Sequence, residues 1–97
     1  MAIFDSLPAS VSIYEVSPRD GLQNESAQVA THAKVRLIEA LIDAGLKRIE
    51  VTSFVSAKWV PQMSDADQVC RMVEKPADVT FSALVPNARG IERALAG

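Results

Sequence analysis

The fold of this chain can be deduced from one stretch, Leu37-Ile-Glu-Ala-Leu-Ile-Asp-Ala-Gly-Leu-Lys-Arg-Ile-Glu-Val-Thr52, in which a helical pattern changes into a strand pattern. The apolar residues before Gly45 recur at helical spacing, and Gly45 supplies the left-handed turn that ends a helix. Thr31 can cap the start of this helix. After the turn the residues alternate, with Ile49 and Val51 on one face. We therefore expect a helix over residues 31–44 and a strand over residues 48–52.

The order of strand, loop and helix occurs three times along the chain. Residues 11–16 and residues 79–85 also have strand patterns. A second helix is expected after Ser64, its cap, with Val69, Met72 and Val73 as its packing stripe, and a third helical pattern covers residues 91–96. A repeat of about 32 to 36 residues implies βαβ units in a parallel sheet.

Two architectures contain such units, an open doubly wound sheet and a closed barrel. Neither a G-x-G-x-x-G motif nor a P-loop follows any expected strand, which disfavours the nucleotide-binding form of the open sheet. A (β/α)8 TIM barrel needs about 250 residues, whereas this chain has 97. We expect an α/β fold in which residues 1–97 form the N-terminal part of a single TIM-barrel domain of a longer protein.

The composition excludes several classes of protein. A formal net charge of -2 provides no basic surface for nucleic acid. No apolar run approaches the roughly 18 residues of a membrane span. Residues 1–8 lack the pattern of a signal peptide, so we expect a cytoplasmic location. The single Cys70 is expected to be a small buried hydrophobe, and His32, next to the expected helix cap, is given no catalytic role.

A polar segment follows the first expected strand, Val16-Ser-Pro-Arg-Asp-Gly-Leu-Gln-Asn-Glu25. An Arg-Asp pair in a loop is most often a solvated turn, but a loop at a strand end is also where binding and catalytic groups usually lie. Glu50 is placed in the middle of a strand between β-branched residues. Such a carboxylate either faces water or has a partner, because burying it alone is costly.

Three segments together resemble the 3-hydroxy-3-methylglutaryl-coenzyme A lyase family: Glu15-Val-Ser-Pro-Arg-Asp-Gly-Leu-Gln-Asn-Glu25, Ile49-Glu-Val-Thr-Ser-Phe-Val-Ser-Ala-Lys-Trp-Val-Pro-Gln-Met63 and Leu84-Val-Pro-Asn87. The Arg-Asp-Gly motif by itself is shared by a superfamily of metal-dependent lyases and synthases on a TIM barrel. The segment that starts at Ser53 is the specific one, and it points to the lyase branch.

The resemblance implies cleavage of a coenzyme A thioester, 3-hydroxy-3-methylglutaryl-CoA, to acetyl-CoA and acetoacetate, as in leucine degradation and ketone-body formation. It also implies a divalent cation, Mg²⁺ or Mn²⁺. By the motif, Asp20 corresponds to a metal ligand, Arg19 to a substrate-binding cation that stabilises the enolate, and Gln23 to a position near the metal and substrate. Glu50 corresponds to an acidic residue of the same site, and we expect it to form an ion pair with Arg19. The full-length protein is expected to be a homo-oligomer.

The resemblance leaves alternatives open. The other metal ligands of the family and its reactive cysteine loop come from strands beyond residue 97, so we expect the 97-residue chain to be inactive by itself. A related acyl-CoA condensing enzyme would share the Arg-Asp-Gly motif. A non-catalytic fragment that assembles through an open sheet edge is a third hypothesis.

Overall fold

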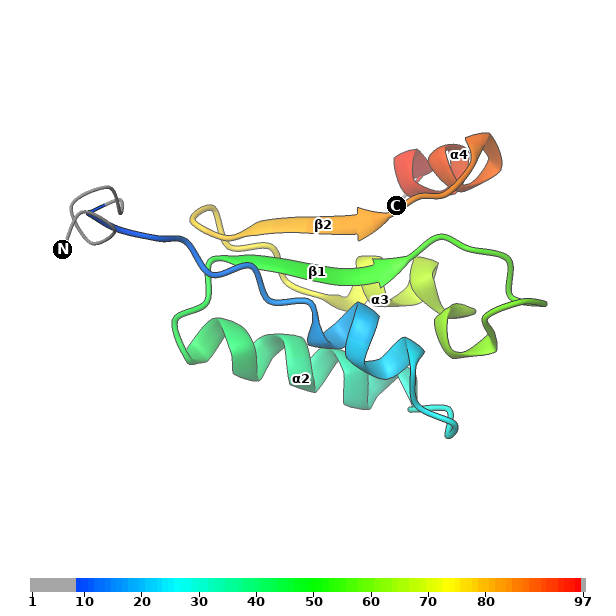
Figure 1. Cartoon of the computed structure of the whole chain (residues 1–97), viewed down its shortest axis with the longest axis horizontal. Coiled ribbons are helices and arrows are strands. Elements are labelled where there is room, and N and C mark those ends of the chain that lie inside the picture. Colours follow the sequence, from blue (N-terminus) through cyan, green and yellow to red (C-terminus); the bar gives the residue numbers. More distant parts are fainter. Residues whose placement is uncertain (1–8, 97) are drawn as a thin grey trace, which may run out of the picture.

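The computed structural model describes residues 9–96, which form a parallel two-stranded sheet with helices around it (Figure 1). Residues 1–8, at the expected lead-in, lie outside the described part. The elements in chain order are the π-helical turn η1 (Ser17–Gly21), α2 (Thr31–Asp43), β1 (Arg48–Ser53), the short 3-10 helix η2 (Pro61–Met63), α3 (Ala66–Met72), β2 (Thr80–Leu84) and α4 (Ala88–Ala96). In the described residues no helix is long and apolar enough to cross a membrane.

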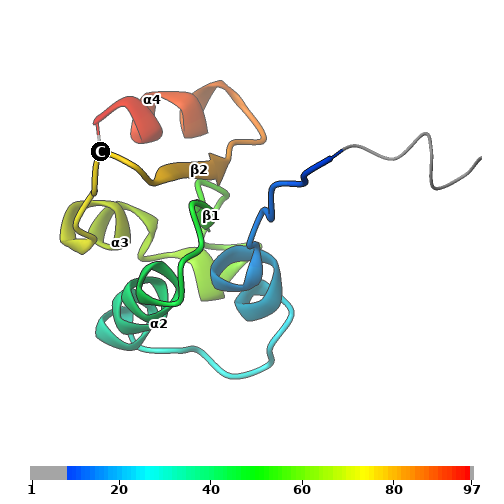
Figure 2. The ribbon, with the colours of Figure 1, turned by 90° about the vertical axis from the view of Figure 1, so that its left-hand side faces the viewer.

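The sheet confirms the predicted parallel βαβ unit. β1 and β2 pair from Arg48 opposite Thr80 to Ser53 opposite Leu84, with an irregularity between Glu50 and Thr52. The helices α2 and α3 contact each other and lie on one side of β1 (Figure 2). β1 is buried along almost its whole length, on the face toward these helices and on the opposite face.

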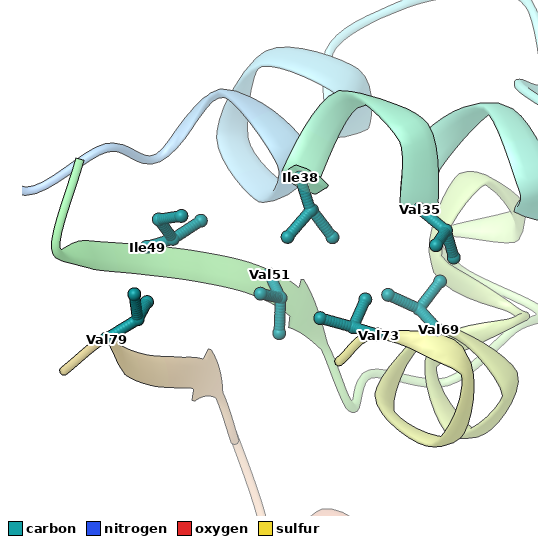
Figure 3. Close-up of a cluster of buried hydrophobic side chains, with 7 residues drawn as sticks. All are labelled: Val35, Ile38, Ile49, Val51, Val69, Val73 and Val79. Atoms are coloured by element: carbon teal, nitrogen blue, oxygen red, sulfur yellow. The ribbon is translucent and has the colours of Figure 1, made fainter. Parts of the chain in front are cut away.

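The core lies between β1 and these two helices (Figure 3). It contains branched aliphatic side chains from all three elements, from the residue after α3 and from the residue before β2: Val35, Ile38, Ile49, Val51, Val69, Val73 and Val79. The predicted end of α2 is confirmed, because Gly45 has φ 97°. The Gly45 N–H donates to the Ile42 carbonyl, and the Leu46 N–H donates to the Leu41 carbonyl, which together satisfy the last turn of the helix.

The predicted first strand over residues 11–16 is wrong except at one position. Only Glu15 bridges to Ile49, through bonds of 2.9 Å from its N–H to the Arg48 carbonyl and 2.8 Å from the Glu50 N–H to its own carbonyl. Val11 and Ile13 are 82% and 63% exposed. The alternating pattern requires cover for its apolar side chains, and the described part of the chain places none over them.

Two predicted helix caps are also wrong. Ala30, not Thr31, precedes α2, and Asp65, not Ser64, precedes α3, without side-chain capping bonds. The Thr31 hydroxyl donates instead to Asp65 Oδ2 at 2.6 Å, so a tertiary contact takes the group that a local cap would use. Met72 is 51% exposed and leaves the predicted stripe, because α3 ends there.

Candidate active site

The Arg-Asp-Gly segment folds into the turn η1 directly after the bridge at Glu15. The Val16 carbonyl accepts from the Arg19 and Asp20 N–H groups at 3.1 and 2.7 Å, and Pro18 is buried beneath the turn. Asn24 Nδ2 donates to the Asp20 carbonyl at 2.8 Å and closes the segment. Single π-helical turns frequently occur at functional sites because they alter where side chains project.

The predicted ion pair between Arg19 and Glu50 is present. Arg19 Nε donates to Glu50 Oε1, and the two side chains are 19% and 11% exposed. Glu50 therefore belongs to the second of the two cases that its strand position allowed, a buried carboxylate with a partner. Its other oxygen, Oε2, accepts from the Tyr14 hydroxyl at 2.9 Å. A carboxylate held at both oxygens has a defined orientation, and it gives the guanidinium one as well.

Asp20 lies in the turn η1, and Gln23 lies two residues after its end. The Asp20 side chain is 54% exposed, with Oδ1 3.5 Å from Arg19 Nη1 and 3.3 Å from Asn24 Nδ2. Gln23 Oε1 is buried and has no hydrogen-bond partner within the described residues. An available carboxylate and an unsatisfied amide oxygen suit a hard divalent cation.

Two oxygen donors do not by themselves complete a cation site. Within residues 9–96 no group of three or more His, Cys, Asp or Glu side chains is placed to hold a metal ion. Oxygen donors of this type are the ones that hard cations such as Mg²⁺ or Mn²⁺ prefer.

Sequence reasoning missed Tyr14 and Ser82, which join the site. The Tyr14 hydroxyl is hydrogen-bonded to both Glu50 and Ser82. The register places Ser82 directly opposite Glu50 on β2. The alternating patterns contained a sign of this contact, because they place Tyr14 and Glu50 on the strand faces opposite the apolar Ile13 and Ile49.

Sequence reasoning also missed a cluster around Lys34, which connects α2 to the segments that contain Gln62 and Glu25. Lys34 is 3% exposed, and its Nζ donates to Asp65 Oδ1 at 2.6 Å and to the Gln62 carbonyl. Gln62 Nε2 donates in turn to the Glu25 carbonyl at 2.7 Å. A lysine in a helix usually faces water, so the sequence alone did not indicate that Lys34 is buried against Asp65.

The remaining singled-out residues lie away from the site. His32 is exposed at the start of α2. Cys70 packs against the core, as predicted, but is only half-buried, and burial raises the pKa of its thiol.

Parallel βα units are common to a TIM barrel and an open α/β sheet, and comparison with known proteins distinguishes the two. A family model described as HMGL-like matches residues 10–96, and the chain belongs to that family. It is 52% identical over 92 residues to the mitochondrial hydroxymethylglutaryl-CoA lyase of Macaca fascicularis, and 50% identical over 90 residues to the hydroxymethylglutaryl-CoA lyase of Bacillus subtilis. These matches cover 95% and 93% of this chain, but only 28% and 30% of the relatives.

Solved structures agree with the sequence relatives. The hydroxymethylglutaryl-CoA lyase of Pseudomonas aeruginosa superposes with a TM-score of 0.90 at 49% identity, over 93% of this chain and 30% of that one. An HMG-CoA lyase of Acinetobacter baumannii in complex with coenzyme A and 3-methylmalate superposes with a TM-score of 0.85 at 41% identity, over 88% and 28%. The predicted α/β fold, the N-terminal portion of a TIM barrel, is confirmed.

Proposed function

We propose that residues 1–97 are the N-terminal part of the single catalytic domain of a hydroxymethylglutaryl-CoA lyase. The proposed reaction cleaves 3-hydroxy-3-methylglutaryl-CoA to acetyl-CoA and acetoacetate with the help of Mg²⁺ or Mn²⁺. One observation carries the proposal, the oriented Arg19–Glu50 pair beside Asp20 in a chain half identical to such lyases.

The proposed reaction breaks the bond between C2 and C3 of the substrate. The C3 hydroxyl loses its proton and becomes the ketone of acetoacetate, and the electron pair of the broken bond forms the enolate of acetyl-CoA. Protonation of that enolate at carbon gives acetyl-CoA. A fixed cation would stabilise the negative charge that develops on the thioester oxygen.

Arg19 is built for this role. Its Nε is engaged by Glu50 and its Nη1 lies 3.5 Å from Asp20 Oδ1, so the guanidinium is anchored on one side and its Nη2 would donate to the thioester oxygen. Preorganised donors of this kind require little reorganisation as charge develops. Asp20 and Gln23 would contribute oxygen ligands to the divalent cation, which when bound polarises the substrate oxygens and lowers the pKa of the hydroxyl.

The test uses the full-length protein, stripped of metal and then supplied with Mg²⁺ or Mn²⁺. Acetyl-CoA and acetoacetate are expected from 3-hydroxy-3-methylglutaryl-CoA, measured by mass spectrometry. A panel of oxo acids with acetyl-CoA examines the related condensing enzymes. Condensation without cleavage would replace the lyase by that alternative.

A matched pair of variants examines the metal role of Asp20. Asp20 and Asp78 are both exposed carboxylates beside a cation, Arg19 at 3.5 Å and Lys47 at 2.7 Å. Asp20→Asn is expected to raise the metal concentration needed for half-maximal activity by at least about tenfold, whereas Asp78→Asn leaves it unchanged. Equal behaviour of the two variants would remove Asp20 from the metal site.

Three further expectations stay predictions. The full-length protein is expected to be a homo-oligomer in the cytoplasm, and the isolated 97-residue chain is expected to be inactive because residues 9–96 supply no complete set of metal ligands. Light scattering and an activity assay on both chains address the assembly and activity predictions. A 97-residue chain that forms stable assemblies without activity would support the fragment hypothesis.

A further inference from the structure

Three side chains from neighbouring segments of the sheet meet on the face opposite the hydrophobic core. Tyr14 precedes the bridge at Glu15, Glu50 lies on β1, and Ser82 lies opposite Glu50 on β2. The Tyr14 hydroxyl contacts Glu50 Oε2 at 2.9 Å, and it also contacts Ser82 Oγ. Residues far apart in the sequence therefore converge on the carboxylate that holds Arg19.

The donors and acceptors in this row have one consistent arrangement. A phenol has a single hydrogen to donate, and an ionised Glu50 can only accept, so Tyr14 donates to Glu50. Ser82 then donates its hydroxyl hydrogen to the Tyr14 oxygen. The direction of donation thus runs from Ser82 through Tyr14 to Glu50, and both carboxylate oxygens are occupied once Arg19 Nε donates to Oε1.

The ring of Tyr14 is partly exposed and has Arg48 over one face. The residue is 43% exposed, and the Arg48 guanidinium lies over the ring at 5.7 Å from its centre. The Tyr14 hydroxyl donates a hydrogen bond to Glu50, and this bond orients the carboxylate.

We propose that Tyr14 is a positioning residue for Arg19, acting through Glu50, with Ser82 orienting the Tyr14 hydroxyl. The effect on catalysis rests on the proposed lyase function, while the effect on Arg19 does not. Without the Tyr14 hydroxyl, Glu50 loses one of its two restraints, and the guanidinium that it anchors samples more orientations. Since the enolate charge exists only late in the reaction, this loss lowers kcat more than it raises KM.

The experiment compares Tyr14→Phe and Ser82→Ala with Thr80→Ala in the full-length protein. Thr80 is exposed two residues earlier on β2, and its hydroxyl is outside this row of contacts, so it is the matched control. Tyr14→Phe is expected to lower kcat by about tenfold with KM within about twofold. Ser82→Ala is expected to lower kcat by about threefold, and Thr80→Ala leaves it unchanged.

A double-mutant cycle separates positioning from a general loss of stability. In a Glu50→Gln background, Tyr14→Phe is expected to change kcat by less than about twofold, because the carboxylate through which Tyr14 acts is gone. The same tenfold loss in both backgrounds would overturn the proposal.

A second readout needs no activity. Hydrogen exchange of the Arg19 Nε–H, followed by nitrogen-15 NMR of the full-length protein, is expected to accelerate by about fivefold or more in Tyr14→Phe and to stay unchanged in Thr80→Ala. Unchanged exchange in Tyr14→Phe would overturn the positioning role. A wild-type protein without lyase activity would instead overturn the proposed function and leave this measurement to decide on Tyr14.

Discussion

The ion pair between Lys34 and Asp65 predicts an asymmetric response to mutation. The Lys34 side chain is 4% exposed and the Asp65 side chain 14% exposed, with 2.6 Å between Nζ and Oδ1. Asp65 has a second partner in the Thr31 hydroxyl at 2.6 Å, whereas Lys34 has only the neutral Gln62 carbonyl besides Asp65 among the contacts in the described residues. The two single variants therefore strand charges in different surroundings.

The magnitudes follow from these surroundings. Removing one partner of a buried pair costs about 3 to 5 kcal/mol when the other charge is left uncompensated. Asp65→Asn leaves the deeper ammonium without a counter-charge, and we expect a loss of about 3 kcal/mol in the free energy of unfolding. Lys34→Met leaves a carboxylate that keeps a hydroxyl donor and some contact with water, and we expect a loss of about 2 kcal/mol.

Urea or thermal unfolding of the full-length protein measures these losses. A change of 1 kcal/mol shifts the melting temperature of a large domain by about 2 °C, so decreases of about 6 and 4 °C are expected. The double variant is expected to lose less than the sum of the two, because it strands no charge. The surface pair of Lys47 and Asp78, 55% and 67% exposed, is the matched control. Lys47→Met is expected to cost less than about 1 kcal/mol.

Two results would refute this reasoning. One is a Lys34→Met variant that is at least as destabilised as Asp65→Asn, because the asymmetry depends on the unequal burial of the two charges. The other is a pair of single variants no worse than Lys47→Met, which would mean that Lys34 reaches water in solution. Strict additivity in the double variant would show that the two charges do not interact.

Three further predictions concern the site, the core and a close backbone approach. Glu50→Ala is expected to lower kcat of the full-length enzyme by at least about tenfold by releasing Arg19, and unchanged turnover would remove Glu50 from the site. Burial raises the pKa of the Cys70 thiol. The contribution of this thiol to the free energy of unfolding is therefore complete below its pKa in the unfolded chain and is lost as the pH rises through its pKa in the folded protein. Alkylation of Cys70 at pH 8 should be slower in the folded protein than in urea. Gly90→Ala places a Cβ 2.6 Å from the Phe54 carbonyl oxygen and should cost about 1 to 3 kcal/mol, whereas an unchanged melting temperature would show that α4 shifts freely.

Local patterns predicted the elements whose signals are themselves local. The helical spacing before Gly45 and the alternation around Ile49 correspond to α2 and β1 within one residue at each end. The ion pair of Glu50 with Arg19 was also predicted, because a carboxylate in a buried strand needs a counter-charge and the resemblance placed one at the neighbouring strand end.

The failures have a common cause in contacts between distant segments. The strand over residues 11–16 needed cover that the described chain does not supply, so one bridge at Glu15 is all that forms. Thr31 gives its hydroxyl to Asp65 instead of capping α2. In both cases the residues fit the local pattern, but contacts with distant segments decided the structure that forms.

The sequence by itself determined the parallel βα order around β1 and β2 and the membership of the HMGL-like family. The βα order depends on spacing along the chain, which periodicity records directly, whereas the family followed from the resemblance of three motif segments to known lyases and from the family-model match. Only the tertiary structure decided that Tyr14 and Ser82 share the carboxylate of Glu50, and that Lys34 is buried against Asp65. Hydrogen bonds between residues more than 30 positions apart depend on sheet register and helix packing. A local sequence pattern therefore does not predict which two of these side chains come into contact.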